Sequence, residues 1–331
     1  MILRPPRVGL NMICKDEEVV VERCLLSAIK ADLRTWAITD TGSTDTTQRQ
    51  IEHLASEYDI QLYKETVPWS GFAAARNDNL ALTHTADDID LWLQVDADEI
   101  VEKVHDQRHT DADLLHVSLH NEGDGLNIWA ARMTRHATEL RWFGKVHEYI
   151  NGAEGYPWKA ARTDAYRIVS LMDGYRTLAA TRGKQNWDLS QAELAEDRTP
   201  RAVFYAGLCA ESIGLKNQAR ELFDERALME SPGPLGEEEA WFAQLRSAYL
   251  LATDGDPLAP DRLMRAFARR PWRTEPLAVI AFYWQAQGFE EMAKSLWPAL
   301  APWPVNDFLF VDPTLYSPMP ILSDLTRGPN V

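Results

Sequence analysis

The first 120 residues alternate between short β-rich runs and stretches with a helical pattern, and this alternation restricts the possible fold more than any other feature of the sequence. The strand-like runs are 8–14, 35–39, 60–63 and 90–95. The helical patterns between them are 17–31, 46–58 and 73–83. Parallel strands need crossover connections, and helical crossovers give an open α/β sheet whose ligands bind at the carboxyl ends of the strands. Two further runs, 114–119 and 128–133, predict an antiparallel extension of this sheet.

The pattern changes near residue 185, where apolar residues recur three and four positions apart and the strand signal ends. Two stretches share the offsets of the small and aromatic positions of a tetratricopeptide repeat: Gly207, Gly214, Ala219 and Phe223, then Gly288, Ala293 and Trp297. A weaker middle repeat covers 241–271, and an unrelated helical bundle is the alternative. We therefore expect an α/β domain over 1–180, a helical repeat domain over 181–305, and a proline-rich tail over 306–331 that packs on the helices.

The acidic composition excludes several classes of protein. The chain has 50 Asp and Glu against 34 Lys and Arg, which gives a formal charge of −16. Nonspecific nucleic-acid binding depends on clustered Lys and Arg, so the surface as a whole is not expected to bind nucleic acid. Cys14, Cys24 and Cys209 are odd in number and lack CxxC spacing, which predicts neither a disulfide framework nor a zinc site. There is no secretory signal pattern and no apolar run of the ~20 residues that a membrane helix needs. We therefore expect a cytoplasmic protein without a membrane span.

Four polar segments lie at the ends of predicted strands or at the start of a predicted helix: 11–18, 40–45, 69–77 and 96–99. Asp96 and Asp98 follow an apolar strand and lie on the same side of an extended chain, where two carboxylates suit a hard divalent cation that keeps water and diphosphate ligands. Taken alone, this pair more often belongs to a solvated acidic turn than to a metal site. In the same way, 40–45 contains good helix-capping residues, and Arg76 is suited either to phosphate or to a surface ion pair.

In their order and spacing, the four segments resemble the N-terminal half of family 2 glycosyltransferases with the GT-A fold, and in particular a subgroup that carries tetratricopeptide-like helices behind that domain. The resemblance is strong over residues 7–100 and looser over 140–320. It implies a Rossmann-like α/β GT-A domain, of the nucleotide-diphospho-sugar transferase type, followed by an all-α domain like tetratricopeptide repeats. It also implies an enzyme that transfers a sugar from a nucleotide-diphosphate sugar, with UDP favoured, to an acceptor hydroxyl or thiol with inversion.

The resemblance assigns the donor and metal sites as well. It implies a nucleotide-sugar site in which Asp40 recognises the base and Arg76 lies near the diphosphate, with the full set being Asn11, Lys15, Asp40, Asp45, Arg76, Asn77 and Asp96. A divalent cation, Mn or Mg, would stabilise charge on the leaving diphosphate. Its implied direct ligand is Asp98, and the further candidates are Asp96, His147 and Asp173.

The stretch from Trp142 to Glu148 resembles the "G.VHE" segment of this family, which makes Glu148 the general base for the acceptor hydroxyl. His147 is either a metal ligand or a structural hydrogen-bonding residue. Two positions depart from the family pattern. Gly71 stands where many relatives have an acidic residue, and 172–175 reads Met-Asp-Gly-Tyr where relatives often have a histidine able to complete the metal shell.

No motif identifies the acceptor. Arg262, Arg265 and Arg269 lie three and four positions apart on one helix face, which suits the phosphates of a nucleic acid but also a solvated face paired with carboxylates. We expect these arginines and Trp142 to contact the acceptor. A peptide side chain, a glycan and a hydroxylated nucleobase in DNA all stay open as acceptors held by the helical domain.

Two other functions compete with a glycosyltransferase. A noncatalytic protein that senses sugar nucleotides and interacts through its helical repeats is the alternative. A dinucleotide-binding oxidoreductase is excluded, because the turn after the first strand lacks the second glycine of GxGxxG.

Overall fold

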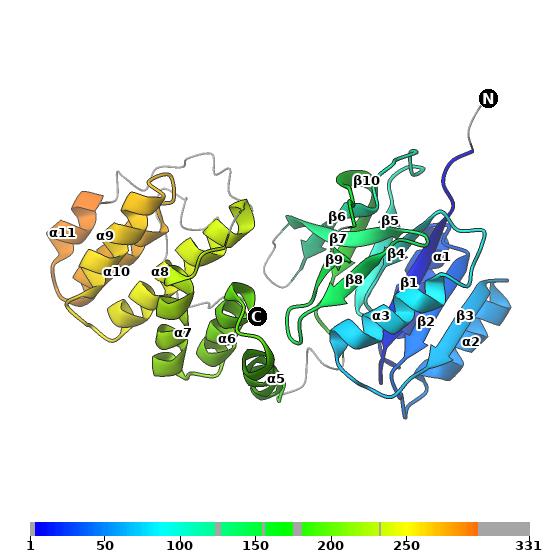
Figure 1. Ribbon diagram of the computed structural model, residues 1–331, viewed down its shortest axis with the longest axis horizontal. Helices are drawn as coiled ribbons and strands as arrows, with labels where there is room; N and C mark the ends of the chain where they lie inside the picture. The colour runs from blue at the N-terminus through cyan, green and yellow to red at the C-terminus, as the bar shows by residue number, and fades with distance from the viewer. Residues whose placement is uncertain (1–3, 123–126, 154–155, 175–180, 232, 297–331) are drawn as a thin grey trace. The chain divides into compact units, whose positions relative to one another are not determined.

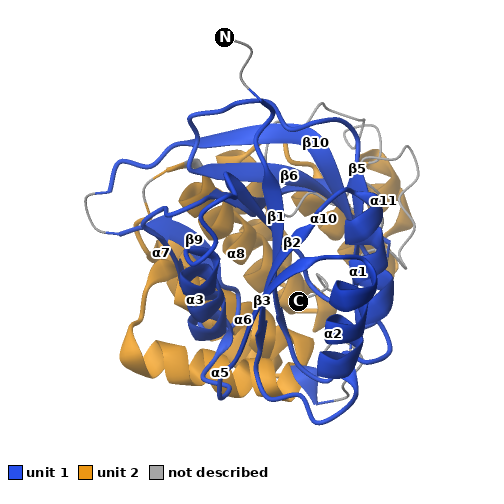
Figure 2. Cartoon of the chain, turned by 90° about the vertical axis from the view of Figure 1, so that its right-hand side faces the viewer, with its two compact units in different colours: residues 1–182 blue, residues 183–331 orange. Residues whose placement is uncertain are grey.

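The computed structural model describes residues 4–122, 127–153, 156–174, 181–231 and 233–296. The chain divides into two compact units, Met1–Arg182 and Gly183–Val331 (Figure 2). This division falls close to the predicted boundary at residue 180. The predicted tail 306–331 and the repeat residue Trp297 lie outside the described residues.

The first unit is built on an eight-stranded sheet with the order β3-β2-β1-β4-β7-β6-β10-β5 (Figure 1). Its first half is parallel and consists of β1 (Val8–Cys14), β2 (Thr35–Asp40), β3 (Gln61–Thr66) and β4 (Leu91–Gln94). Its second half is mixed and consists of β5 (Glu99–Lys103), β6 (Leu114–Asn121), β7 (Asn127–Arg135) and β10 (Ala160–Ser170). Strand β7 is antiparallel to both β4 and β6, which confirms the predicted antiparallel extension.

A separate two-stranded sheet joins β8 (Leu140–Phe143) to β9 (Tyr149–Gly152). Neither this pair nor β5 and β10 are predicted from the sequence. Strand β10 is parallel to β6 and antiparallel to β5, and both partners lie far from it in the sequence. No local period therefore indicates these pairings.

Helices cover the two faces of the parallel strands. Helix α3 (Phe72–Thr83) packs on β1, β2 and β8, whereas α1 (Val21–Lys30) and α2 (Thr47–Glu57) pack on each other and on β5 and β3 (Figure 2). Because side chains alternate along a strand, Leu10 and Met12 join the core with α1 and α2 while Asn11 points to the opposite face. The face beneath α3 therefore contains buried polar side chains as well as apolar ones.

Helix α1 begins four residues later than the sequence predicted. The backbone N–H groups of Val20 and Val21 both donate to the carbonyl of Glu17, so the preceding residues form a turn. Asp16 has a φ of 53°, which a helix does not allow. This turn is important for the site, because its side chains bind the loop that follows β2.

The regular elements in the described part of the second unit are all helices, as predicted. Its helices are α5 (Arg182–Glu196), α6 (Pro200–Ser212), α7 (Lys216–Leu228), α8 (Pro234–Thr253), α9 (Ala259–Arg269), α10 (Glu275–Ala286) and α11 (Glu290–Leu296). From α6 onward each helix contacts the next, and α8 also contacts α6 and α10, which is the stacking of tetratricopeptide-like helix pairs. Gly207 explains one signature position, because a Cβ there would lie 2.6 Å from the ring of Phe223.

No helix in the described part of the chain is long and apolar enough to cross a membrane.

The three cysteines are free and buried. Burial raises the pKa of all three thiols, and the nearby carboxylates of Asp40 and Glu99 raise those of Cys14 and Cys24 further. At about pH 8 these groups are therefore thiols rather than reactive thiolates. We expect negligible reaction of the native protein with a disulfide reagent such as DTNB, and three equivalents after unfolding. Rapid labelling of the native protein would contradict this.

Candidate functional site

The loops that follow β1 and β2 are tied together by reciprocal hydrogen bonds. Asp16 accepts from the N–H and hydroxyl of Thr44, and Glu18 accepts from those of Thr46. In return, the Glu18 N–H donates to Asp45 Oδ2 at 3.1 Å. Since β1 and β2 are parallel neighbours, their carboxyl ends meet at one edge of the sheet. Both predicted loop segments therefore form one structure at that edge.

Asp40 and Asp45 are engaged within these loops. Asp40 Oδ1 accepts from the N–H groups of Gly42 and Ser43, both at 2.8 Å. Asp45 Oδ1 accepts from the N–H and hydroxyl of Thr47 at the start of α2. Burial opposes the ionised form of each carboxylate, but these hydrogen bonds lower the pKa of both. Both side chains are thus fixed as anions.

Beneath α3, a buried amide cluster links the helix to the sheet. Asn11 is 2% exposed and donates to Asn79 Oδ1 at 3.0 Å. Asn79 Nδ2 in turn lies within 3.1 Å of acceptors on Met12, Ala37 and Thr39. Asn11 therefore lies in the interior of the sheet, whereas Lys15, at the start of the following loop, is exposed.

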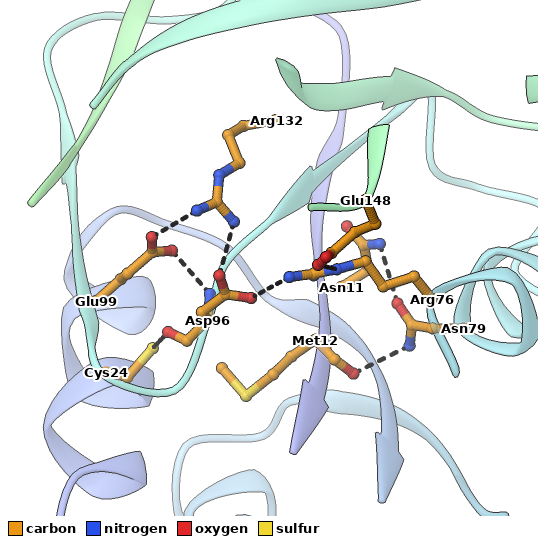
Figure 3. A network of polar contacts seen from close by, with 9 residues as sticks. All are labelled: Asn11, Met12, Cys24, Arg76, Asn79, Asp96, Glu99, Arg132 and Glu148. Atoms are coloured by element: carbon orange, nitrogen blue, oxygen red, sulfur yellow. Dashed lines mark hydrogen bonds and ion pairs between the residues drawn. The ribbon is translucent and has the colours of Figure 1, made fainter. Parts of the chain in front are cut away.

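A network of charged side chains surrounds the end of β4 (Figure 3). Asp96 accepts from Arg76 Nη2 at 3.1 Å through Oδ1 and from Arg132 Nη1 at 3.0 Å through Oδ2. Arg76 also donates from Nε to Glu148 Oε1 at 2.8 Å, and Arg132 donates from Nη2 to Glu99 Oε1 at 2.7 Å. Five charged residues from distant parts of the sequence thus form one continuous chain of ion pairs.

Burial and charge determine the protonation of this network. Burial alone would raise the pKa of Asp96, but the guanidinium groups of Arg76 and Arg132 outweigh it and lower that pKa. Burial raises the pKa of Glu99, with the charges of Asp96 and Asp98 adding to it and Arg132 opposing. Asp96 is consequently an anion at any physiological pH.

Asp98 is placed differently from Asp96. Its Oδ2 accepts from the N–H of Gly174 at 3.3 Å, and it makes no ion pair within the described part of the chain. Burial and the charge of Asp96 raise its pKa. A Cβ on residue 174 would lie 3.1 Å from Asp98 Oδ2, so any larger residue there would require the Asp98 side chain to shift by a few tenths of an ångström.

The four candidate metal ligands, Asp98, Asp96, His147 and Asp173, differ in the partners that they have. Both oxygens of Asp96 face guanidinium groups, and Asp173 forms a bidentate ion pair with Arg23 at 2.9 and 2.7 Å. Among the described residues, no three His, Cys, Asp or Glu side chains are grouped as a metal ion would require. Of the three candidate carboxylates, Asp98 is the one without an ion pair in the described part of the chain.

Asn77 has a structural partner. Its Oδ1 accepts from the backbone N–H of Trp142 at 2.8 Å and its Nδ2 donates to the Trp142 carbonyl at 2.9 Å. Asn77 therefore binds the free edge of β8 as another strand would. This contact attaches the β8–β9 sheet, which leads to Glu148, to helix α3.

Replacing Asn77 by alanine is expected to lower the free energy of unfolding by about 2 kcal/mol, because two backbone groups of Trp142 lose their partner. Urea unfolding measures the loss, and hydrogen exchange at the Trp142 amide should accelerate. Asp78→Ala is the control, since Asp78 is the exposed neighbour on the same helix. Unchanged exchange at Trp142 would show that Asn77 does not hold β8.

Trp142 also lies against Arg76. The Arg76 guanidinium carbon is 5.2 Å from the Trp142 ring centroid, within the range of a cation–π contact. Arg76 Nη1 and Trp142 Nε1 are both buried and have no hydrogen-bond partner among the described residues. Each is a donor available to a ligand.

The arginine stripe lies on α9 of the second unit. Arg262 donates to Asp224 at 2.9 and 3.0 Å, and Arg265 pairs with Asp261 at 3.0 Å. These pairs match the alternative of a helix face paired with carboxylates. Arg269 is the last residue of the same helix.

Three residues of the site were missed as functional candidates: Asn79, Glu99 and Arg132. A signal for Arg132 was present, since it is an arginine within the otherwise apolar run 128–133. Glu99 ends the acidic motif, and Asn79 is a polar residue on the buried face of α3. Nothing in the sequence alone indicates that Arg132 reaches Asp96.

The sequence of residues 11–153 matches the family model for glycosyl transferase family 2. This range runs from the middle of β1 to the end of β9 and contains the whole ion-pair network described above. The protein therefore carries a family 2 glycosyltransferase domain, in a GT-A-like unit followed by tetratricopeptide-like helices. No curated protein matches the sequence.

Several solved structures are similar to parts or most of the chain. TarS of S. aureus, residues 1–349 in complex with UDP-GlcNAc, is 13% identical with a TM-score of 0.39, over 88% of this chain and 90% of that one. MamA (AMB-1) is 19% identical with a TM-score of 0.30, over 35% of this chain. The protein spans 65% of the length of that MamA chain. A mycobacterial protein is 14% identical with a TM-score of 0.36, over 57% of this chain and 74% of that one.

Proposed function

We propose that this protein transfers a sugar from a nucleotide-diphosphate sugar, with UDP favoured, to an acceptor hydroxyl or thiol with inversion. One observation carries the proposal: Glu148, Arg76 and Asp96 are linked at 2.8 and 3.1 Å at the carboxyl end of β4, within the family 2 domain. A base, a cation for phosphate oxygens and an acidic motif thus lie side by side where an α/β sheet binds ligands. The acceptor is a peptide side chain, a glycan or a hydroxylated nucleobase, for which the helical unit, Trp142 and the arginines of α9 are the proposed contacts.

In this proposal Arg76 donates to the diphosphate, and Glu148 accepts the proton of the acceptor hydroxyl or thiol as that group bonds to the sugar carbon. The bond between the sugar carbon and the phosphate oxygen breaks in the same step, and the nucleoside diphosphate leaves with its electron pair. Asp40, Asp45, Lys15 and the loops after β1 and β2 surround the nucleotide. Asp98 would hold a divalent cation, Mn or Mg, which stabilises negative charge on the leaving diphosphate. His147 and Asp173 stay secondary candidates as ligands. The free thiols of three cysteines suit a reducing compartment, and we propose the cytoplasm.

Donor binding tests this function. Purified protein is titrated calorimetrically with UDP-, GDP-, dTDP- and CMP-sugars, with and without Mn²⁺ or Mg²⁺, and its thermal unfolding is followed in parallel. A bound donor at 100 times its Kd should add about 2.7 kcal/mol of stability. Release of nucleoside diphosphate then reports turnover. Binding without turnover would favour the noncatalytic sensor, and absence of binding to every donor would contradict the proposal.

Asp98→Asn tests the metal assignment. The neutral amide is a poorer ligand for a hard cation, so Mn²⁺ affinity in the presence of nucleoside diphosphate is expected to fall about tenfold or more, at least 1.4 kcal/mol. Electron paramagnetic resonance of free Mn²⁺ measures this without an acceptor. Asp87→Asn is the control, because Asp87 is exposed on the loop before β4. Equal affinities for Mn²⁺ in the two variants would overturn the assignment.

A further inference from the structure

Arg132, on β7, is a largely buried arginine whose guanidinium group interacts with two carboxylates. Its side chain is 13% exposed, and its two terminal nitrogens are divided between Asp96 and Glu99 (Figure 3). Glu99 in turn accepts from the backbone N–H of Asp96 at 2.8 Å through its other oxygen. Arg132 and Glu99 therefore hold Asp96 by both its side chain and its backbone.

The orientation of Arg76 depends on Asp96. The two oxygens of Asp96 are shared between Arg132 and Arg76, so fixing one oxygen fixes the direction of the other. Arg76 is held at Nη2 by Asp96 and at Nε by Glu148, and its Nη1 is the buried nitrogen without a partner in the described part of the chain. The planar guanidinium has no remaining rotation once two of its nitrogens are held. The two N–H groups of its third nitrogen then have fixed directions in which to donate.

We infer that Arg132 is a positioning residue of the donor site: it holds Asp96 so that Arg76 directs Nη1 to a diphosphate oxygen while keeping Glu148 in place. This inference rests on the proposed function, since it assumes that the ligand of Arg76 is a nucleoside diphosphate. Residues that orient ligand-binding groups from behind typically change affinity or activity about 10–100-fold when they are replaced. Arg132 touches neither the sugar nor the acceptor in this arrangement.

Arg132→Lys is the first test, because an ammonium keeps the charge but lacks the planar fork that serves two carboxylates at once. Kd for UDP is measured by calorimetry and is expected to rise about 10–100-fold. The matched control is Arg167→Lys, an arginine on β10 that pairs with Glu102 at the surface of the same unit. Its Kd for UDP should equal that of the wild type. Circular dichroism and Tm establish that both variants are folded.

Arg132→Ala with added guanidinium ion is the second test. Millimolar guanidinium, far below denaturing concentrations, should restore UDP affinity to this variant and leave that of Arg132→Lys and the wild type unchanged. A purely structural role would instead give a lower Tm with an unchanged Kd for UDP in Arg132→Lys, and this result would overturn the inference. If both Arg132 variants bind UDP with the Kd of the wild type, the inference is overturned but the proposed function is not. A wild type that binds no nucleoside diphosphate overturns the proposed function as well.

Discussion

Replacing Glu148 by glutamine is expected to slow the release of nucleoside diphosphate from the donor about 10²- to 10⁴-fold, the contribution of a positioned general base. An amide cannot accept the acceptor proton at neutral pH. It does retain an oxygen for the hydrogen bond from Arg76 Nε, which measures 2.8 Å in the wild type. Donor affinity and Tm are therefore expected to stay near their wild-type values, so the loss should appear in kcat.

Glu139→Gln is the matched control for this experiment. Glu139 is an exposed glutamate in the turn that precedes β8, and it belongs to the same unit as Glu148. Its variant should turn over like the wild type. If Glu148→Gln also kept full turnover with either water or acceptor, Glu148 would not be the base, and a different group near Arg76 would have to take the proton.

Replacing Asp96 by alanine is expected to give the largest loss of stability, about 3–5 kcal/mol in the free energy of unfolding. The reason is that two largely buried guanidinium groups, those of Arg76 and Arg132, would lose the carboxylate between them. The two remaining cations would then face each other without a shared anion. Asp96→Asn should lose less, since one oxygen remains to accept from one arginine.

Urea unfolding followed by tryptophan fluorescence measures this effect, because Trp36 and Trp92 are fully buried in the first unit. The two units can unfold in separate transitions, so the midpoint of the transition reported by these residues is the quantity to compare. Asp78→Ala removes an exposed carboxylate from α3 and should leave that midpoint unchanged. A midpoint for Asp96→Ala within error of the wild type would show that the network contributes no stability.

Much of the fold could be read from local periodicity. The alternation in the first 120 residues predicted β1 to β4 with their helices. The signal is clearest for β2 and β4, because a parallel strand buried on both faces is a mainly apolar run in the sequence. The helical period likewise predicted the second unit. Strands β5 and β10 escaped prediction because β5 follows directly on the acidic motif and β10 pairs with segments far away in the chain.

The candidate site, like the fold, could be predicted from the sequence only in part. The resemblance grouped the loops after β1, β2 and β4 correctly at one edge of the sheet, since parallel neighbouring strands end together. It did not reveal how individual side chains are used. Asn77 binds the backbone of Trp142, and Asp173 pairs with Arg23, although the sequence suggested a ligand-binding role for both.

By itself, the sequence determined the class of fold and the positions of the motifs, because strand and helix periods and strand-end segments are local properties of the chain. The tertiary structure alone decided which charges meet. Arg132 reaches Asp96 only because β7 lies beside β4 in the sheet. That pairing is set by the packing of the whole domain, although the two residues are 36 positions apart in the sequence. A buried charge needs a partner of opposite charge, and the fold determines which residue lies close enough to be that partner. No local sequence pattern specifies it.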